Sequence, residues 1–267
     1  MAESVAVRDP LRVALVQARL HWQDPSANRE HLATLLDREP GADLYVLPEA
    51  FSKGFLGDLG GPAETLQGET VAWMRAQAAR RSALVAGSLA LEVDGHRRNR
   101  MLVVDATGIQ ADYDKRHLFG FGGEDERYRA GTGHGILDWC GWRVDLQICY
   151  DLRFPVWCRN TRGFDLQLFV ANWPSPRVEA WRSLLKARAI ENQSYVIGVN
   201  CTGRHGNDIE YPGRSSAWGP SGECLLEFDG AEAIATVELD RRALDAFRRR
   251  FPFLADADEF TLQPPSP

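Results

Sequence analysis

Glu49, Lys115 and Cys149 are residues that could together activate a thiol for attack on a carbonyl carbon. A free cysteine is mostly protonated at neutral pH. A nucleophilic thiol therefore needs a base that takes its proton and a cation that favours the thiolate or the anion formed on attack. A glutamate and a lysine can supply these two roles. We therefore consider Cys149 as a nucleophile, Glu49 as its base and Lys115 as the cation.

All three residues follow segments that we predict to be extended. These segments are 43–47 before Glu49, 111–114 before Lys115 and 142–148 before Cys149. In open α/β folds the carboxyl ends of the strands open into the ligand crevice, so the three side chains could converge on one site. A helix is predicted to begin near Pro155, and it would point the backbone N–H groups after the thiol at a developing oxyanion.

Ordinary structural roles compete with this hypothesis. A cysteine at the end of a strand is more often a packing residue than a nucleophile. Glu49 could be a solvated loop carboxylate, and Lys115 could be a surface cation that pairs with Asp112 or Asp114. The spacing alone does not decide between these interpretations.

Other reactive residue types form weaker patterns. The six histidines show no HxxxH or HxH metal-ligand spacing, and the glycines form no phosphate-binding motif, so we expect no metal and no cofactor. A Cys-His hydrolase remains an alternative, in which His117 or His134 would serve as the base for Cys149. The other cysteines are assigned to packing, namely Cys140, Cys158, Cys201 and Cys224.

Apolar segments rich in Val, Leu and Ile predict the strands that must position these residues. They are 12–20, 43–47, 83–93, 101–105, 142–148, 166–171, 195–200 and 234–239. Amphipathic segments 28–38, 69–81 and 178–191 predict helices. Helices interleaved with strands, and a hairpin around Asp94-Gly95, favour an α/β sandwich with mixed sheets over a purely doubly wound fold.

Composition narrows the class of protein. The chain has 267 residues, of which 44% are hydrophobic and 25% charged, as is typical of a globular protein. A net charge of −6 and the absence of a basic segment argue against nucleic acid or an anionic membrane as partner. With no apolar segment long enough to span a bilayer and an odd number of cysteines, we expect a cytoplasmic protein with reduced thiols. We predict one domain over 1–267, with a core of about 11–260 and a tail at 261–267.

Four ordered blocks of sequence resemble the nitrilase superfamily of carbon-nitrogen hydrolases. The blocks are 44–49 with Phe51, 113–119, 148–155, and 172–174 leading to 187–192, within a likeness that covers about 11–260. The resemblance implies a four-layer α-β-β-α sandwich, a homodimer and a catalytic triad of Glu49, Lys115 and Cys149. It also implies a second glutamate that orients the lysine and the substrate, where the spacing favours Glu124 over Glu126.

Within the superfamily, the blocks look most like the bacterial branch of ω-amidases. Such enzymes hydrolyse the terminal amide of 2-oxoglutaramate or 2-oxosuccinamate to the 2-oxo-dicarboxylate and ammonia. Arg153 is the candidate for the substrate carboxylate, because its planar fork can bind a carboxylate bidentately. Its alternative role is an ion pair with Asp151. Phe119, Tyr150 and Trp173 would form the pocket walls, although aromatic residues in such blocks could equally be core.

The predicted reaction proceeds through a Cys149 thioester. Glu49 accepts the thiol proton, and Lys115 with the backbone N–H of Tyr150 stabilises the oxyanion. The same chemistry would suit another small acid amide, such as deaminated glutathione or an N-carbamoyl amino acid, or a nitrile. A catalytically silent binding or scaffold protein is the alternative outside enzymes.

Overall fold

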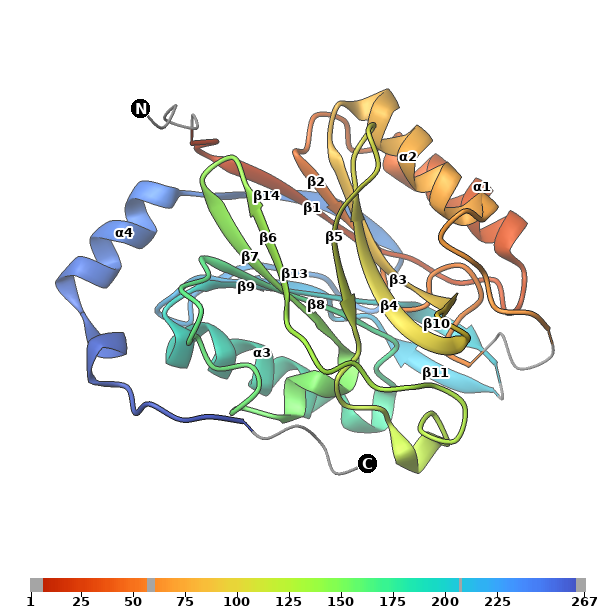
Figure 1. Cartoon of the computed structure of the whole chain (residues 1–267). Coiled ribbons are helices and arrows are strands. Elements are labelled where there is room, and N and C mark those ends of the chain that lie inside the picture. Colours follow the sequence, from red (N-terminus) through yellow and green to blue (C-terminus); the bar gives the residue numbers. More distant parts are fainter. Residues whose placement is uncertain (1–6, 57–60, 207, 263–267) are drawn as a thin grey trace.

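Two six-stranded sheets packed face to face form the centre of the molecule, and helices cover their outer faces (Figure 1). This is the arrangement of a computed structural model, which describes residues 7–56, 61–206 and 208–262. The architecture confirms the predicted α-β-β-α sandwich. Residues 263–267 of the predicted tail lie outside the described residues, and 261–262 have no regular secondary structure.

The first sheet contains strands from the beginning of the chain and one strand from near its end. Its order is β14 (Ala233–Leu239), β1 (Leu11–Gln17), β2 (Leu44–Val46), β3 (Leu84–Val93), β4 (His96–Val104) and β5 (Ile109–Asp114). Strands β1, β2 and β3 are parallel, whereas the other neighbours are antiparallel. Helices α1 (Pro25–Leu36) and α2 (Glu69–Arg81) cover its outer face (Figure 1).

The second sheet carries the predicted nucleophile. Its order is β13 (Cys224–Glu227), β12 (Ser216–Trp218), β9 (Tyr195–Asn200), β8 (Leu166–Ala171), β7 (Trp142–Ile148) and β6 (Gly135–Trp139). Helix α3 (Val178–Asn192) packs on its outer face (Figure 1). A separate hairpin, β10 (Thr202–His205) with β11 (Ile209–Pro212), follows β9. Helix α4 (Arg241–Arg250) extends from the end of β14.

Alternation along the strands builds two apolar layers. In β1, Val13 and Leu15 belong to the core between the sheets, whereas Ala14 and Val16 pack toward α1 and α2. Both faces of the strand are therefore covered, which explains its nearly continuous apolar sequence. Each fully buried Val or Leu side chain stabilises the fold by about 1.5–3 kcal/mol.

Most predicted elements are confirmed, and some boundaries agree residue by residue. Helix α2 and strands β7, β8 and β9 have the predicted bounds. The hairpin around Asp94-Gly95 is also present, because both residues adopt positive φ (52° and 73°) and close a two-residue turn between Val93 and His96. Its second strand begins at His96 rather than at 101, so Asn99 lies within the sheet.

Other predictions were wrong. The first strand ends at Gln17 and not at 20, and the sequence did not predict β6, β10, β11, β12, β13 or α4. No helix begins near Pro155; instead the 3-10 helix η2 (Cys149–Arg153) starts at the cysteine itself. Phe154, the residue before the proline, leaves the helical region with φ −113° and ψ 87°, which is the restriction that proline imposes on its predecessor.

Close packing of α3 against β9 depends on Gly198. A Cβ atom there would lie 2.4 Å from Leu185 and 2.8 Å from Trp181. We therefore expect Gly198→Ala to lower the free energy of unfolding by about 1–3 kcal/mol, as overpacking does. Urea unfolding measures this change. Gly133→Ala is the matched control, because a Cβ there meets no atom within 4 Å. Equal stability of the two variants would contradict the packing.

Candidate active site

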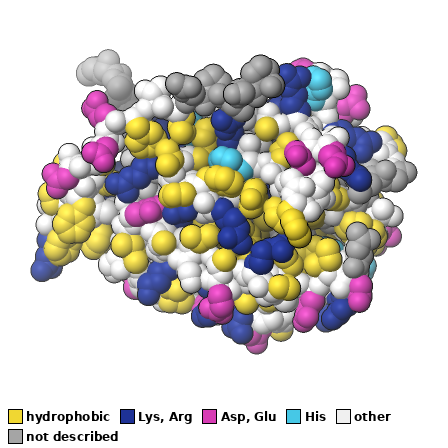
Figure 2. All heavy atoms as spheres, turned by 90° about the horizontal axis from the view of Figure 1, so that it is seen from below, with side chains coloured by type: hydrophobic (Ala, Val, Ile, Leu, Met, Phe, Trp, Pro, Cys, Tyr) yellow, Lys and Arg dark blue, Asp and Glu magenta, His cyan; other side chains and the backbone are white. Residues whose placement is uncertain are grey.

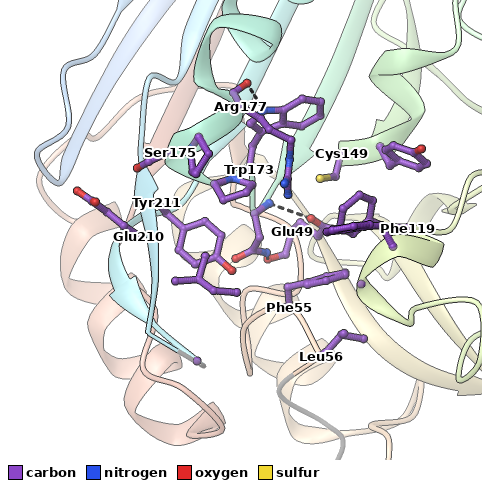
Figure 3. Close-up of a pocket in the computed structure, with 18 of the residues that line it drawn as sticks. Glu49, Phe55, Leu56, Phe119, Cys149, Trp173, Ser175, Arg177, Glu210 and Tyr211 are labelled. Atoms are coloured by element: carbon purple, nitrogen blue, oxygen red, sulfur yellow. Dashed lines mark hydrogen bonds between the residues drawn. The ribbon is translucent and has the colours of Figure 1, made fainter.

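The three predicted catalytic residues line one cavity and follow the ends of β2, β5 and β7. Figure 3 shows two of them, Glu49 and Cys149, at this cavity. The cavity has a volume of about 820 Å³. It also brings in the other side chains predicted for the site, which are Phe119, Tyr150, Arg153 and Trp173. The convergence expected from strand ends is therefore found in the structure.

Lys115 lies between two carboxylates and has no solvent-exposed side-chain area. Its Nζ donates to Glu49 Oε1 at 2.8 Å and to Glu124 Oε2 at 2.9 Å. Burial acts to lower the pKa of Lys115, but the negative charges of Glu124 and Glu49 outweigh it and leave the pKa raised. The ammonium group therefore stays charged. Of the two candidate supporting glutamates, Glu124 makes this contact, whereas Glu126 is exposed.

Asn99, which the sequence analysis missed, bridges the two carboxylates. Its Nδ2 donates to Glu49 Oε1 at 2.8 Å and to Glu124 Oε1 at 3.0 Å. Glu124 also accepts the backbone N–H of Phe119 at 2.7 Å. Burial, followed by the charge of Glu49, raises the pKa of Glu124 against the opposing effect of Lys115. The sequence did hold one signal for Asn99, because a polar residue there lies on the same face of β4 as the buried Met101.

The carboxylate of Glu49 is held on both oxygens. While Oε1 accepts from Lys115 and Asn99, Oε2 accepts the backbone N–H of Asn172 at 2.8 Å. The Asn172 side chain donates to the backbone carbonyl of Glu49 at 2.5 Å, which joins the end of β2 to the end of β8 across the two sheets. Glu49 is therefore a fixed, buried carboxylate rather than a solvated loop carboxylate.

Cys149 faces this carboxylate from a left-handed backbone conformation with φ 46°. Such a conformation is unfavourable for a non-glycine residue, and it persists where the surroundings hold it. Burial and then the charge of the nearby Glu49 raise the pKa of Cys149 well above its usual value, against the weaker effect of Lys115. Cys149 is thus a thiol at rest, and the charge of Lys115 is placed where it could stabilise an anion formed by attack of that sulfur.

Asp151 ties the cysteine turn to the lysine segment. Its carboxylate accepts the backbone N–H of Ile148 at 3.1 Å and the hydroxyl of Tyr113 at 2.9 Å. It also accepts the backbone N–H of His117 at 2.9 Å. From the outer side, buried Arg188 of α3 donates to the carbonyl of Leu152 at 2.6 Å. These bonds hold the turn that presents Cys149.

Neither histidine proposed as an alternative base lines this cavity. His117 contacts Asp151 Oδ1 through Nδ1 at 2.8 Å and stacks on Phe154 with ring centroids 3.7 Å apart. His134 stacks on Trp157, and burial followed by the charge of Arg162 lowers its pKa to about 4. The Cys-His interpretation therefore lacks a base near the thiol.

Arg153 extends over an aromatic wall of the cavity. Its guanidinium carbon lies 4.8 Å from the centroid of the Trp173 ring. Asp151 is occupied by His117 and Tyr113, so the alternative ion pair between Arg153 and Asp151 is not formed. Tyr150 packs edge-on against Phe119 at 5.1 Å. Among the described residues, no group of three or more His, Cys, Asp or Glu side chains could hold a metal ion.

Glu49 is expected to control the reactivity of the Cys149 thiol. Because the thiol pKa is raised, alkylation needs a neighbouring base. We predict one fast thiol in the wild type, at Cys149, and at least a tenfold slower reaction in Glu49→Gln, measured by mass spectrometry after iodoacetamide treatment. Glu126→Gln, which changes an exposed carboxylate, should react at the wild-type rate. Fast alkylation in Glu49→Gln would contradict the assignment.

Removal of the central cation should destabilise the fold. Lys115→Met leaves Glu49 and Glu124 buried without their counter-charge, which costs about 3–5 kcal/mol. Chemical unfolding gives the difference. Lys186→Met serves as the control, because Lys186 is exposed on α3. A Lys115→Met protein as stable as the wild type would show that the carboxylates do not need this charge.

Sequence comparison relates the chain to known enzymes. The sequence model of the carbon-nitrogen hydrolase family matches residues 12–249. The chain is 44% identical over 253 residues to omega-amidase YafV of Escherichia coli K12, covering 94% of this chain and 98% of that protein. It is 34% identical over 250 residues to 2-oxoglutaramate amidase of Bacillus subtilis 168, covering 91% and 96% respectively.

Solved structures agree with the sequence comparison. A CN-hydrolase superfamily protein from Xanthomonas campestris, with an arsenic adduct in its active site, has a TM-score of 0.93 at 44% identity and covers 96% of this chain and 100% of its own. Nit3 of Saccharomyces cerevisiae, in the nitrilase superfamily, has a TM-score of 0.82 at 23% identity, with coverages of 94% and 97%, a likeness that shows the fold alone.

The helices of the described chain include none both long and apolar enough to cross a membrane. The chain belongs to the carbon-nitrogen hydrolase family of the nitrilase superfamily, and it is a hydrolase of carbon-nitrogen bonds.

Proposed function

We propose that the protein is an ω-amidase, which hydrolyses the terminal amide of 2-oxoglutaramate or 2-oxosuccinamate to the 2-oxo-dicarboxylate and ammonia. The observation that carries this proposal is the buried cluster of Glu49, Lys115 and Glu124 beside the partly exposed Cys149, at a cavity that is also lined by arginines. The similarity to proteins named omega-amidase and 2-oxoglutaramate amidase supports the substrate class.

Acylation begins when Glu49 accepts the proton of the Cys149 thiol and the sulfur attacks the amide carbon. The negative charge that develops on the amide oxygen is stabilised by the Lys115 ammonium and the backbone N–H of Tyr150. Glu49 then returns the proton to the amide nitrogen, the carbon-nitrogen bond breaks, and ammonia leaves. Glu124 and Asn99 keep Lys115 and Glu49 in place during this step.

Deacylation uses the same groups. Glu49 removes a proton from water, and the resulting hydroxide attacks the thioester carbon. The carbon-sulfur bond then breaks, and the sulfur of Cys149 receives the proton back from Glu49. The products are the 2-oxo-dicarboxylate and the free enzyme.

We expect preferential ammonia release from 2-oxoglutaramate. The panel also contains glutamine, asparagine, an N-carbamoyl amino acid, deaminated glutathione and a simple nitrile. Cys149→Ala is the blank and should be inactive because it lacks the nucleophilic sulfur. Preference for another compound would assign that compound as the substrate and leave the proposed hydrolase chemistry unchanged. Inactivity toward every compound would favour a scaffold protein.

Activity is expected to remain flat as the pH rises from about 7 to about 9. Burial and the charge of Glu49 raise the pKa of Cys149, and the charges of Glu124 and Glu49 raise that of Lys115 despite burial, so both groups keep their protons across this range. The protonated thiol beside Glu49 is the reactive form, and its population does not change. A kcat/KM that increases steeply toward pH 9 would instead indicate a thiolate formed by simple ionisation.

A homodimer in the cytoplasm is part of the proposal. Large apolar side chains are exposed at Val156, Ile190, Phe253 and Leu262, and Figure 2 shows hydrophobic side chains interspersed with lysine and arginine on one face. Pairing of such a surface would cover apolar area. The reducing conditions of the cytoplasm would keep the Cys149 thiol in its reactive form. Light scattering during gel filtration tests the dimer, and a monomeric mass would contradict it.

A further inference from the structure

Two arginines at the cavity have no acidic partner among the described residues. Arg153 ends η2, and Arg177 ends η3 (Ser175–Arg177), immediately before α3. Both line the cavity, and the structure gives neither guanidinium an ion pair. Figure 3 shows Arg177 beside Trp173, across the cavity from Phe55 and Leu56. A half-buried guanidinium without a counter-ion is suited to binding an anionic ligand.

Trp173 holds both arginines in place. Its ring lies under the Arg153 guanidinium at 4.8 Å, and its indole N–H donates to the backbone carbonyl of Arg177 at 2.7 Å. The Arg177 guanidinium in turn lies 5.2 Å from the centroid of the Phe119 ring. Both guanidinium groups thus rest on aromatic faces, an arrangement that leaves their N–H edges available.

The remaining charged groups at the cavity do not neutralise this pair. Glu49 and Glu124 share Lys115, at 2.8 Å and 2.9 Å, and leave one negative charge in excess against the two arginines. At the rim, Asp208 and Glu210 share Arg204, which lies 3.2 Å from Asp208 and 3.7 Å from Glu210. Arg127, exposed at the edge, adds further positive charge. The interior beside Trp173 is therefore positive.

We propose that Arg177 is a specificity-determining residue that acts with Arg153 on the 2-oxo acid end of the substrate. This inference rests on the proposed ω-amidase function and explains its selectivity. A carboxylate next to a 2-oxo group presents only hydrogen-bond acceptors, whereas guanidinium groups present only donors. Glutamine carries an ammonium group at the same carbon, and two arginines would repel it. The pair therefore selects the oxo-amide over the amino acid.

The test compares substrates that differ at this end only. We would measure kcat/KM of the wild type, Arg177→Gln and Arg177→Lys with 2-oxoglutaramate, glutamine and the uncharged butyramide. In Arg177→Gln, the ratio of 2-oxoglutaramate to butyramide should fall at least tenfold, mainly through KM, and the ratio to glutamine should also fall. Arg177→Lys should lie between the two. Arg182→Gln is the matched control, because Arg182 lies in α3 and pairs with Glu227 outside the cavity.

Binding gives a second readout without turnover. Titration of 2-oxoglutarate into Cys149→Ala should show at least tenfold weaker binding when Arg177→Gln is added, and the difference should shrink as salt increases. Unchanged ratios and unchanged binding in Arg177→Gln would overturn the role of Arg177, as would an equal loss with all three amides. A wild type that ignores 2-oxoglutaramate would instead overturn the proposed function itself.

Discussion

The site depends on one interaction, which is the pairing of a lysine ammonium group that has no access to water with two buried carboxylates. Taking such a charge out of water is unfavourable unless opposite charges and hydrogen bonds replace the solvent. Glu49 and Glu124 provide the charges for Lys115, and Asn99 bridges their oxygens. Two carboxylates exceed the charge of one ammonium, and this excess helps to keep the thiol of Cys149 neutral at rest. In the proposed mechanism, Glu49 therefore takes the proton of the Cys149 thiol only when the sulfur attacks a substrate.

The sandwich supplies the rigidity that this arrangement needs. Glu49 and Lys115 come from the first sheet and Cys149 from the second, so the apolar layer between the sheets determines how closely the base and the thiol approach. Asn172 and Asp151 then connect the strand ends by hydrogen bonds across that layer. A change in the packing between the sheets would therefore alter the distance between the Glu49 carboxylate and the Cys149 thiol, because the two residues belong to different sheets.

The sequence predicted the parts of this design that depend on strand ends. The segments before Glu49 and Cys149 were predicted as strands because they are apolar and short, and the segment before Lys115 was predicted to be extended. The second glutamate was implied by the resemblance to the nitrilase superfamily, within which the spacing favoured Glu124. Contacts that cross the two sheets could not be predicted in the same way. Asn99 and Asn172 reach Glu49 from distant strands, and no local pattern marks such pairs. Arg177 was missed because a cation before a helix has no distinctive spacing.

Local physics also explains the incorrect predictions. The turn at Cys149 begins before Pro155 because Asp151 accepts the N–H of Ile148 and because proline restricts Phe154. Helix α4 was missed because its ten residues are rich in arginine and only Leu244 among them is buried, so few apolar side chains mark it as part of the folded core.

The most direct test of the account is to trap the acyl-enzyme. Wild-type protein mixed with 2-oxoglutaramate, quenched with acid within one turnover and digested, should yield the peptide containing Cys149 with the mass of the substrate less ammonia added. Hydroxylamine should remove that mass, because thioesters react with it. Turnover of 2-oxoglutaramate without this adduct, or with the adduct on another residue, would contradict the central claim that the buried lysine-carboxylate cluster activates the Cys149 thiol.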